Sequence, residues 1–153
     1  LLINKIIKKL IKNNVSVSTA ESCTGGLLSS KITSIPGVSK IFYMGLITYS
    51  NNAKIKLLKI KPSKIKKFGA VSCEIAIIMV NNLQKISKSK ICISITGIAG
   101  PSGGTRKKPV GLVYIGIKYR KKTIIINKKF KGSRKNIQNK TIEVIFKNLE
   151  KLI

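Results

Sequence analysis

Apolar residues recur along the chain at helical spacing in some segments and in short strand-like runs in others. Residues 2–12 place leucine and isoleucine at intervals of three and four, which predicts a helix. β-Branched or apolar runs predict five strands, at about 15–19, 41–49, 90–96, 110–119 and 123–130. Further helices are predicted at about 24–33, 51–58, 62–69 and 73–86, and after residue 134.

The order of these elements indicates the fold class. Helices alternate with strands in the first part of the chain, and an antiparallel hairpin comes late. We therefore expect one domain over residues 1–153, an α/β fold with three layers (α/β/α) and a mixed, mostly parallel sheet. The strand at 41–49 is expected to be buried. Ser50 and Ser72 are expected to cap the helices that follow them, and Pro62 to begin another.

Basic residues dominate the charge. Lysine and arginine number 31 against four glutamates, which gives a formal net charge of +27. Of the 31, 28 are lysines scattered along the chain, and lysine, isoleucine and asparagine are the residues of AT-rich codons. We interpret most of the charge as compositional drift. Non-specific adhesion to nucleic acid at low salt is expected in either case, although aromatic residues, at 5%, are few for base stacking.

The residue inventory excludes several classes of catalytic site. The chain has no histidine, so a Ser-His-Asp triad, a Cys-His dyad and a histidine-ligated zinc site are impossible. It has no aspartate, and its four glutamates lie far apart in the sequence, so we expect no carboxylate metal cage. Acid–base catalysis near neutral pH is therefore expected mainly from lysine, tyrosine, cysteine or one glutamate. Of these, lysine is the base that best suits a serine nucleophile, provided that burial or cationic neighbours lower the lysine pKa.

Three cysteines, Cys23, Cys73 and Cys92, are an odd number without metal-binding spacing. We expect reduced thiols in a cytoplasmic protein. No run of 18 apolar residues is present, and the N-terminal residues lack the apolar core and cleavage site of a signal peptide, so we expect no membrane association.

The segment Thr19–Gly26 places reactive side chains at a predicted strand-to-helix turn. Free backbone N–H groups and the positive end of the helix dipole favour an anion, or a developing oxyanion, at such a turn. Ser22 and Cys23 are both candidate nucleophiles, because a thiolate at a helix N-terminus is also activated.

A second turn, residues 96–105, also follows a strand and is rich in glycine. Ligands of open α/β sheets bind outside the carboxyl ends of the strands, so both turns are expected to face one pocket. The alternative is that the glycines only allow tight turns. Lys54, near Tyr49 in the first turn of a predicted helix, and Arg134, at another helix start, are further candidates. Taken alone, each is interpreted as an ordinary solvated surface residue.

Six segments together resemble one family. They are Thr19–Gly26, Thr48–Lys54, Phe68–Glu74, Thr96–Thr105, Lys108–Gly111 and Phe130–Arg134. In this order they cover nearly the whole chain. They resemble the C-terminal domain of the competence/damage-inducible protein CinA and its stand-alone form, the nicotinamide-nucleotide amidohydrolases known as PncC.

The resemblance implies hydrolysis of the carboxamide of nicotinamide mononucleotide (NMN) to nicotinate mononucleotide and ammonia. It implies Ser22 as nucleophile, Lys54 as base and Tyr49 as a relay or orienting group, with no metal or organic cofactor. The two turns and Arg134 are expected to bind the substrate, through Glu21, Thr24, Gly25, Gly26, Thr96, Gly97, Gly100, Gly103, Gly104, Thr105 and Arg134. Glu21 is expected to have a structural or positioning role rather than to act as a base. Whether the protein forms a homo-oligomer stays open.

The chain departs from the family pattern at a few positions. Family members often carry glutamate at position 52, an acidic residue or glycine at 102, proline and glutamate around 106–107, and a further arginine near 138. This chain has Asn52, Ser102, Arg106, Lys107 and Gln138 there. The loss near Gln138 would weaken phosphate binding. The alternative function is therefore a catalytically degenerate domain that binds a polyanion or a partner, which the charge favours and the intact motifs oppose.

Overall fold

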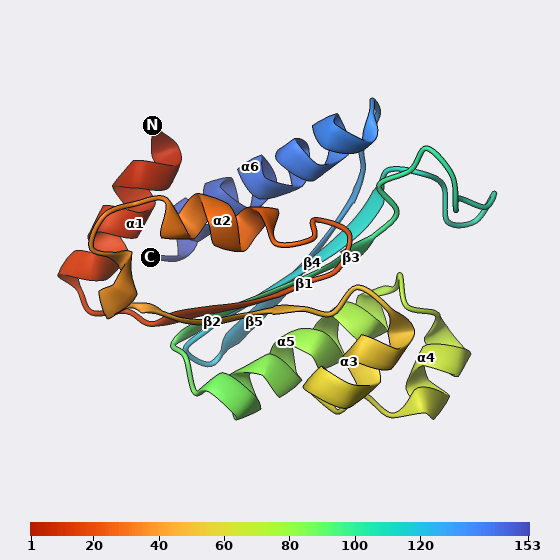
Figure 1. Cartoon of the computed structure of the whole chain (residues 1–153), viewed down its shortest axis with the longest axis horizontal. Coiled ribbons are helices and arrows are strands. Elements are labelled where there is room, and N and C mark those ends of the chain that lie inside the picture. The colour runs from red at the N-terminus through yellow and green to blue at the C-terminus, as the bar shows by residue number, and fades with distance from the viewer.

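A five-stranded sheet lies between two layers of helices (Figure 1). The computed structural model describes all 153 residues. The strands are β1 (Val17–Glu21), β2 (Phe42–Ile47), β3 (Ile91–Gly97), β4 (Leu112–Tyr119) and β5 (Lys122–Lys129), in the spatial order β2-β1-β3-β4-β5. β1 pairs in parallel with β2 and β3, whereas β4 runs antiparallel to β3 and β5. The expected three-layer fold with a mixed sheet is confirmed.

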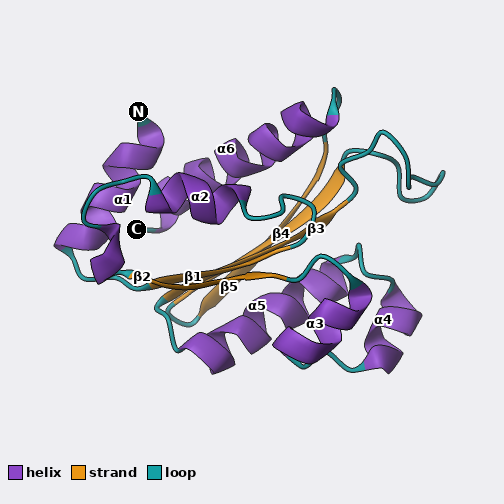
Figure 2. Ribbon diagram, in the orientation of Figure 1, coloured by secondary structure: helices purple, strands orange, loops and turns teal.

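The helices divide between the two faces of the sheet (Figure 2). One face is covered by α1 (Leu2–Lys12), α2 (Leu27–Thr33) and α6 (Arg134–Leu152), and the other by α3 (Asn51–Leu58), α4 (Pro62–Phe68) and α5 (Cys73–Ser87). A short 3₁₀ turn, η1 (Val38–Lys40), precedes β2. The predicted caps are present, since Ser50 Oγ accepts from the Ala53 N–H at 3.0 Å and Ser72 Oγ from the Ile75 N–H at 3.2 Å. No helix has the length and apolar character that crossing a bilayer requires.

Each helical layer closes its own apolar core against the sheet. The larger cluster has 23 buried residues and includes Ile6, Leu28 and Phe146, from α1, α2 and α6. The smaller has nine and includes Leu58 and Met79, from α3 and α5. Because β1 and β3 are central and covered on both faces, they are buried along nearly their whole length. The loops that follow β1 and β3 therefore leave from deeply buried strands.

Two expectations need correction. The predicted helix over residues 24–33 begins only at Leu27, because Gly25 and Gly26 adopt φ values of 56° and 103°, which an α-helix does not allow. The strand at 41–49 is not buried. β2 is an edge strand whose side chains alternate between half-buried and exposed, with Tyr43 65% and Ile47 53% exposed.

Candidate active site

A cavity of about 210 Å³ opens where β1 and β3 end. Both glycine-containing turns line it, so the expectation that they face one pocket is confirmed. Its lining residues are Ser22, Cys23, Tyr49, Gly97, Ile98, Ala99, Gly100, Ser102, Gly103 and Arg134. The turn after β1, the loop after β3 and the start of α6 meet here although they lie far apart in the sequence.

Lys54 reaches Ser22 from the opposite helical layer. It lies in the first turns of α3 and is only 1% exposed. Its Nζ is 3.1 Å from Ser22 Oγ, and it also donates to the main-chain oxygens of Thr48, at 2.8 Å, and Tyr49, at 3.2 Å. Ser22 itself is 7% exposed. The two side chains that the family resemblance pairs are therefore in hydrogen-bond contact inside the protein.

Burial sets the protonation of this lysine. Desolvation of the ammonium lowers the pKa of Lys54 from 10.5 to about 8, and the neighbouring Cys23 opposes part of the shift. A neutral amine has two N–H donors and one lone pair. In the structure Lys54 Nζ donates to Ser22 Oγ as well as to the carbonyls of Thr48 and Tyr49, and the Ser22 hydroxyl donates to the Tyr49 oxygen at 3.3 Å. In the neutral amine the two carbonyls can accept both N–H groups, which turns the lone pair toward Ser22 Oγ. Burial thus raises the fraction of Lys54 in the form that can accept a proton from Ser22.

Glu21 belongs to the scaffold of the turn. Its side chain is fully buried and accepts five hydrogen bonds: from Thr24 Oγ1 at 2.5 Å, the N–H of Gly26 at 3.2 Å, that of Leu28 at 3.0 Å, and the N–H and Oγ of Ser29 at 2.7 and 2.8 Å. These donors include the free N–H groups at the start of α2, which has no capping side chain of its own. Glu21 ties the turn after β1 to α2 and does not line the cavity.

Cys23 is buried and has a suppressed acidity. Its side chain is 5% exposed, and desolvation raises the pKa of the thiol to about 12. The thiolate is therefore scarce at neutral pH, which disfavours Cys23 as the nucleophile. All three cysteines are free.

Arg134 links the two walls of the cavity. Its guanidinium donates from Nη1 to the Gly100 oxygen and from Nη2 to the Tyr49 hydroxyl, both at 2.6 Å. Tyr49 is 55% exposed, and the side chain of Tyr49 faces Arg134 while its main-chain oxygen faces Lys54. The phenol hydroxyl therefore makes no hydrogen bond to Ser22 or Lys54.

The remaining predicted binding residues divide into two groups. Gly97, Gly100 and Gly103 line the cavity, whereas Thr24, Gly25, Gly26, Thr96, Gly104 and Thr105 do not. The hydroxyls and turn amides of this second group serve the local structure: Thr96 Oγ1 donates to the Ala70 oxygen, the Gly25 N–H to the Ser22 oxygen, and Thr105 Oγ1 accepts from the Lys108 N–H. They support the loops that form the cavity.

Two buried main-chain donors in the lining loop are free. The N–H groups of Ala99 and Gly100 donate no hydrogen bond within the protein, although Ala99 is 4% exposed. Buried N–H groups without an acceptor are rare in folded proteins. In the turn after β1 the amides of Gly25 and Gly26 already donate, whereas those of Cys23 and Thr24 donate to no other residue, so both the loop and the turn hold candidate oxyanion donors.

Some contributors carry no signal in the sequence. The main-chain oxygens of Thr48 and Tyr49 position Lys54, and any residue type presents the same oxygen. Gln138 donates from Nε2 to the Cys23 oxygen at 2.9 Å and so bridges α6 to the turn after β1. The sequence marks Gln138 only as a departure from the family pattern, because its contact with the Cys23 oxygen depends on how α6 packs.

Comparisons with known proteins agree with this architecture. The family model described as the CinA C-terminal domain matches residues 2–153. A CinA-like protein of Kosmotoga olearia is 50% identical over 135 residues, which cover 88% of this chain and 33% of that protein. The chain spans about a third of the length of the curated relatives that it matches.

Solved structures match nearly the whole fold. The competence/damage inducible protein CihA from Agrobacterium tumefaciens has a TM-score of 0.92 and 34% identity, covering 99% of this chain and 96% of that one. A CinA superfamily protein from Escherichia coli has a TM-score of 0.93 and 26% identity, covering 99% and 88%. By sequence and by fold, the chain belongs to the CinA C-terminal domain family.

Proposed function

We propose that this domain hydrolyses the carboxamide of NMN, giving nicotinate mononucleotide and ammonia. The observation that carries the proposal is the buried pair of Lys54 and Ser22, whose Nζ and Oγ lie 3.1 Å apart. With a pKa of about 8, Lys54 is neutral in about one molecule in ten at pH 7. That population is sufficient for a general base, and family membership supports the choice of substrate.

In the first half of the reaction, Lys54 Nζ takes the proton of the Ser22 hydroxyl while Oγ attacks the carboxamide carbon. The carbonyl electron pair moves onto oxygen, where the N–H groups of Ala99 and Gly100 can donate to it. Removing one donor of this kind typically reduces transition-state stabilisation by about 3–4 kcal/mol. The carbon–nitrogen bond then breaks, and protonated Lys54 returns its proton to the leaving nitrogen, which departs as ammonia.

In the second half, water attacks the acyl-serine ester. Lys54, neutral again, accepts a proton from the water, and the same oxyanion donors serve the second tetrahedral intermediate. The bond between the acyl carbon and Ser22 Oγ breaks, and Oγ recovers its proton from Lys54. The net reaction consumes one water and returns both side chains to their starting states.

The cavity accommodates part of the nucleotide. Its volume of about 210 Å³ is below the range of roughly 300–1,000 Å³ that encloses whole small ligands. We assign the cavity to the nicotinamide ring, with the ribose phosphate at its rim near Arg134 and Gly103. Of the two roles expected for Tyr49, we assign the orienting one, because its hydroxyl accepts from Arg134.

The test is release of ammonia from NMN by the purified protein. Ser22→Ala should lower turnover by at least about 10³-fold without loss of fold, whereas the control Ser30→Ala, an exposed position on α2, should leave the rate unchanged. Wild-type turnover in the Ser22 variant would eliminate the serine mechanism. A folded wild-type protein that releases no ammonia would favour the binding alternative.

A further inference from the structure

A larger cavity lies at the opposite end of the sheet. It has a volume of about 710 Å³ and is bordered by the segments that lead into β1 and β3 and by the end of β4. β3 spans seven residues between the two sites, so roughly 20 Å separates them. The chemistry proposed above makes no use of this second cavity.

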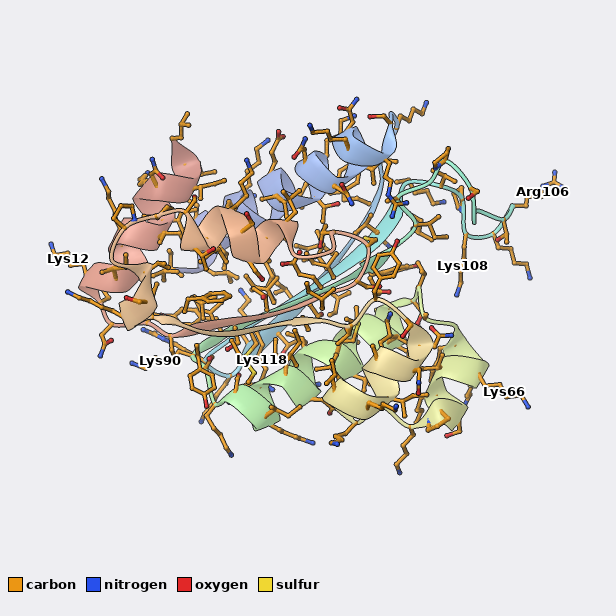
Figure 3. All side chains as sticks on the ribbon, viewed as in Figure 1. Lys12, Lys66, Lys90, Arg106, Lys108 and Lys118 are labelled. Carbon is orange, nitrogen blue, oxygen red and sulfur yellow. The ribbon has the colours of Figure 1, made fainter.

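Five basic side chains line this cavity: Lys9, Lys88, Lys90, Lys118 and Arg120. They come from α1, the end of α5, the approach to β3, the end of β4 and the β4–β5 turn. Figure 3 shows Lys90 and Lys118 at the same end of the molecule, far from Lys66 and Arg106. No carboxylate side chain lines the cavity, and the one ion pair of the protein, between Lys5 and Glu150, lies outside the lining.

Hydrogen bonds to uncharged groups hold three of these lysines. Lys118 Nζ donates to Asn81 Oδ1 at 3.0 Å, Lys90 Nζ to the Asn14 oxygen at 3.3 Å, and Lys9 Nζ to the main-chain oxygen of Ile153 at 2.9 Å. Each ammonium has three N–H groups, so each keeps donors for a ligand. Like charges gathered around one hollow repel each other, and a bound anion would relieve that repulsion.

Compositional drift does not explain Arg120. Lys88 and Arg120 adopt left-handed backbone conformations, with φ of 59° and 57°, which glycine and asparagine occupy at lower free energy, but Lys59, outside the cavity, does the same with φ of 57°. Arginine, in contrast, occurs only three times in this chain, and AT-rich codons do not favour it. Arg120 therefore occupies a position where both backbone preference and composition allow a better residue.

We propose that this cavity binds a compact polyphosphate, a ligand with several adjacent phosphate groups, either inorganic or carried by a nucleotide. Lysine and arginine are the donors that phosphate oxygens prefer, and one phosphate could not span five cations. The volume lies within the range of small-molecule sites. Tyr119 also lines the cavity, with the guanidinium of Arg120 5.0 Å from its ring centroid, and offers a surface for a nucleobase.

The proposal is tested by calorimetric titration of the full chain with inorganic triphosphate and with ATP at about 0.15 M salt. We expect saturable one-to-one binding. Lys90→Gln/Lys118→Gln should weaken it by at least about tenfold. The control Lys56→Gln/Lys66→Gln removes the same charge from exposed positions on α3 and α4 and should change the affinity by less than about twofold.

Two further variants identify the ligand and separate binding from folding. If Tyr119→Ala weakens the binding of ATP but not of triphosphate, the ligand is a nucleotide. If ATP and triphosphate bind with equal affinity to the wild type and to Tyr119→Ala, the ligand is inorganic polyphosphate. Arg120→Gly should lower the affinity for triphosphate and yet raise the melting temperature by about 2–4 °C, since glycine relieves the left-handed backbone. A purely structural role for Arg120 predicts no loss of affinity.

Three results would overturn the proposal. The first is the absence of saturable binding of triphosphate or ATP to the wild-type chain. The second is equal weakening by the control pair, which would indicate diffuse attraction to the whole surface. The third is that single-stranded DNA of about 20 nucleotides displaces triphosphate at a lower phosphate concentration, which would make the surface a nucleic-acid site.

Discussion

The burial of Lys54 should make the stability of the fold depend on pH in a defined window. In the folded protein its pKa is about 8, whereas in the unfolded chain it is near 10.5. Between these values the unfolded state binds more protons, so the free energy of unfolding rises as the pH rises. Below pH 8 the full penalty for burying Lys54 is present, and above about pH 10.5 it is gone.

The size of the effect follows from the two pKa values. At 1.36 kcal/mol per pKa unit, burying Lys54 destabilises the fold by about 3 kcal/mol at pH 7 and about 1 kcal/mol at pH 9.5. Methionine has a similar length and no proton to lose, so Lys54→Met removes this dependence. The stability of the wild-type protein relative to Lys54→Met should therefore rise by about 2 kcal/mol between pH 7 and pH 9.5.

Urea unfolding followed by circular dichroism at the two pH values measures this difference. All other titrating groups are common to the two proteins and cancel to first order. Lys56→Met, on the exposed side of the same helix, is the matched control and should show no such trend. A difference between wild type and Lys54→Met that stays constant within about 0.5 kcal/mol would refute the lowered pKa, and with it the neutral base at pH 7.

Three other substitutions test the remaining contacts. In Glu21→Gln an NH₂ group takes the place of a carboxylate oxygen that contacts only hydrogen-bond donors. We expect the free energy of unfolding in urea to fall by about 3 kcal/mol; a fall of less than about 1 kcal/mol would contradict the structural role of Glu21. Arg134→Lys cannot bond both Gly100 and Tyr49 as the planar fork does, and steady-state kinetics on NMN should show KM raised by about tenfold with kcat nearly unchanged. A fall in kcat alone would instead place Arg134 in the chemical step. Cys23→Ala should leave turnover within about twofold, because the high thiol pKa keeps Cys23 protonated; inactivation of the wild type by a thiol reagent that spares this variant would contradict that.

Local patterns predicted most of the elements, but the burial of one strand and the start of one helix were wrong. The amphipathic spacing in residues 2–12 and the serine caps at 50 and 72 depend on neighbouring residues, and the structure confirms them. The prediction that the strand at 41–49 is buried was wrong, because an apolar run alone does not distinguish an edge strand from a central one. The predicted start of α2 was three residues too early, because Gly25 and Gly26 adopt left-handed conformations that apolar periodicity does not reveal.

For the candidate site, the chain's own inventory already narrowed the chemistry. Without histidine or aspartate, a serine nucleophile needs another base, and the motif resemblance predicted Ser22 as nucleophile and Lys54 as base. Their contact depends on long-range pairing: β1 and β2 lie in parallel register, and the Thr48 N–H donates to the Glu21 oxygen at 2.8 Å. This pairing sets the residues after β2 beside the turn after β1.

Residue identity therefore determined which groups are available, and tertiary packing decided their state. The lowered pKa of Lys54 is a property of its desolvation, and no local window of sequence reports how much water surrounds a side chain. The same holds for the cations that gather around the second cavity, since five separate segments bring them together. The sequence gives each side chain's charge and functional group, whereas the burial of a side chain and its distance from others are set only when the sheet and both helical layers have assembled.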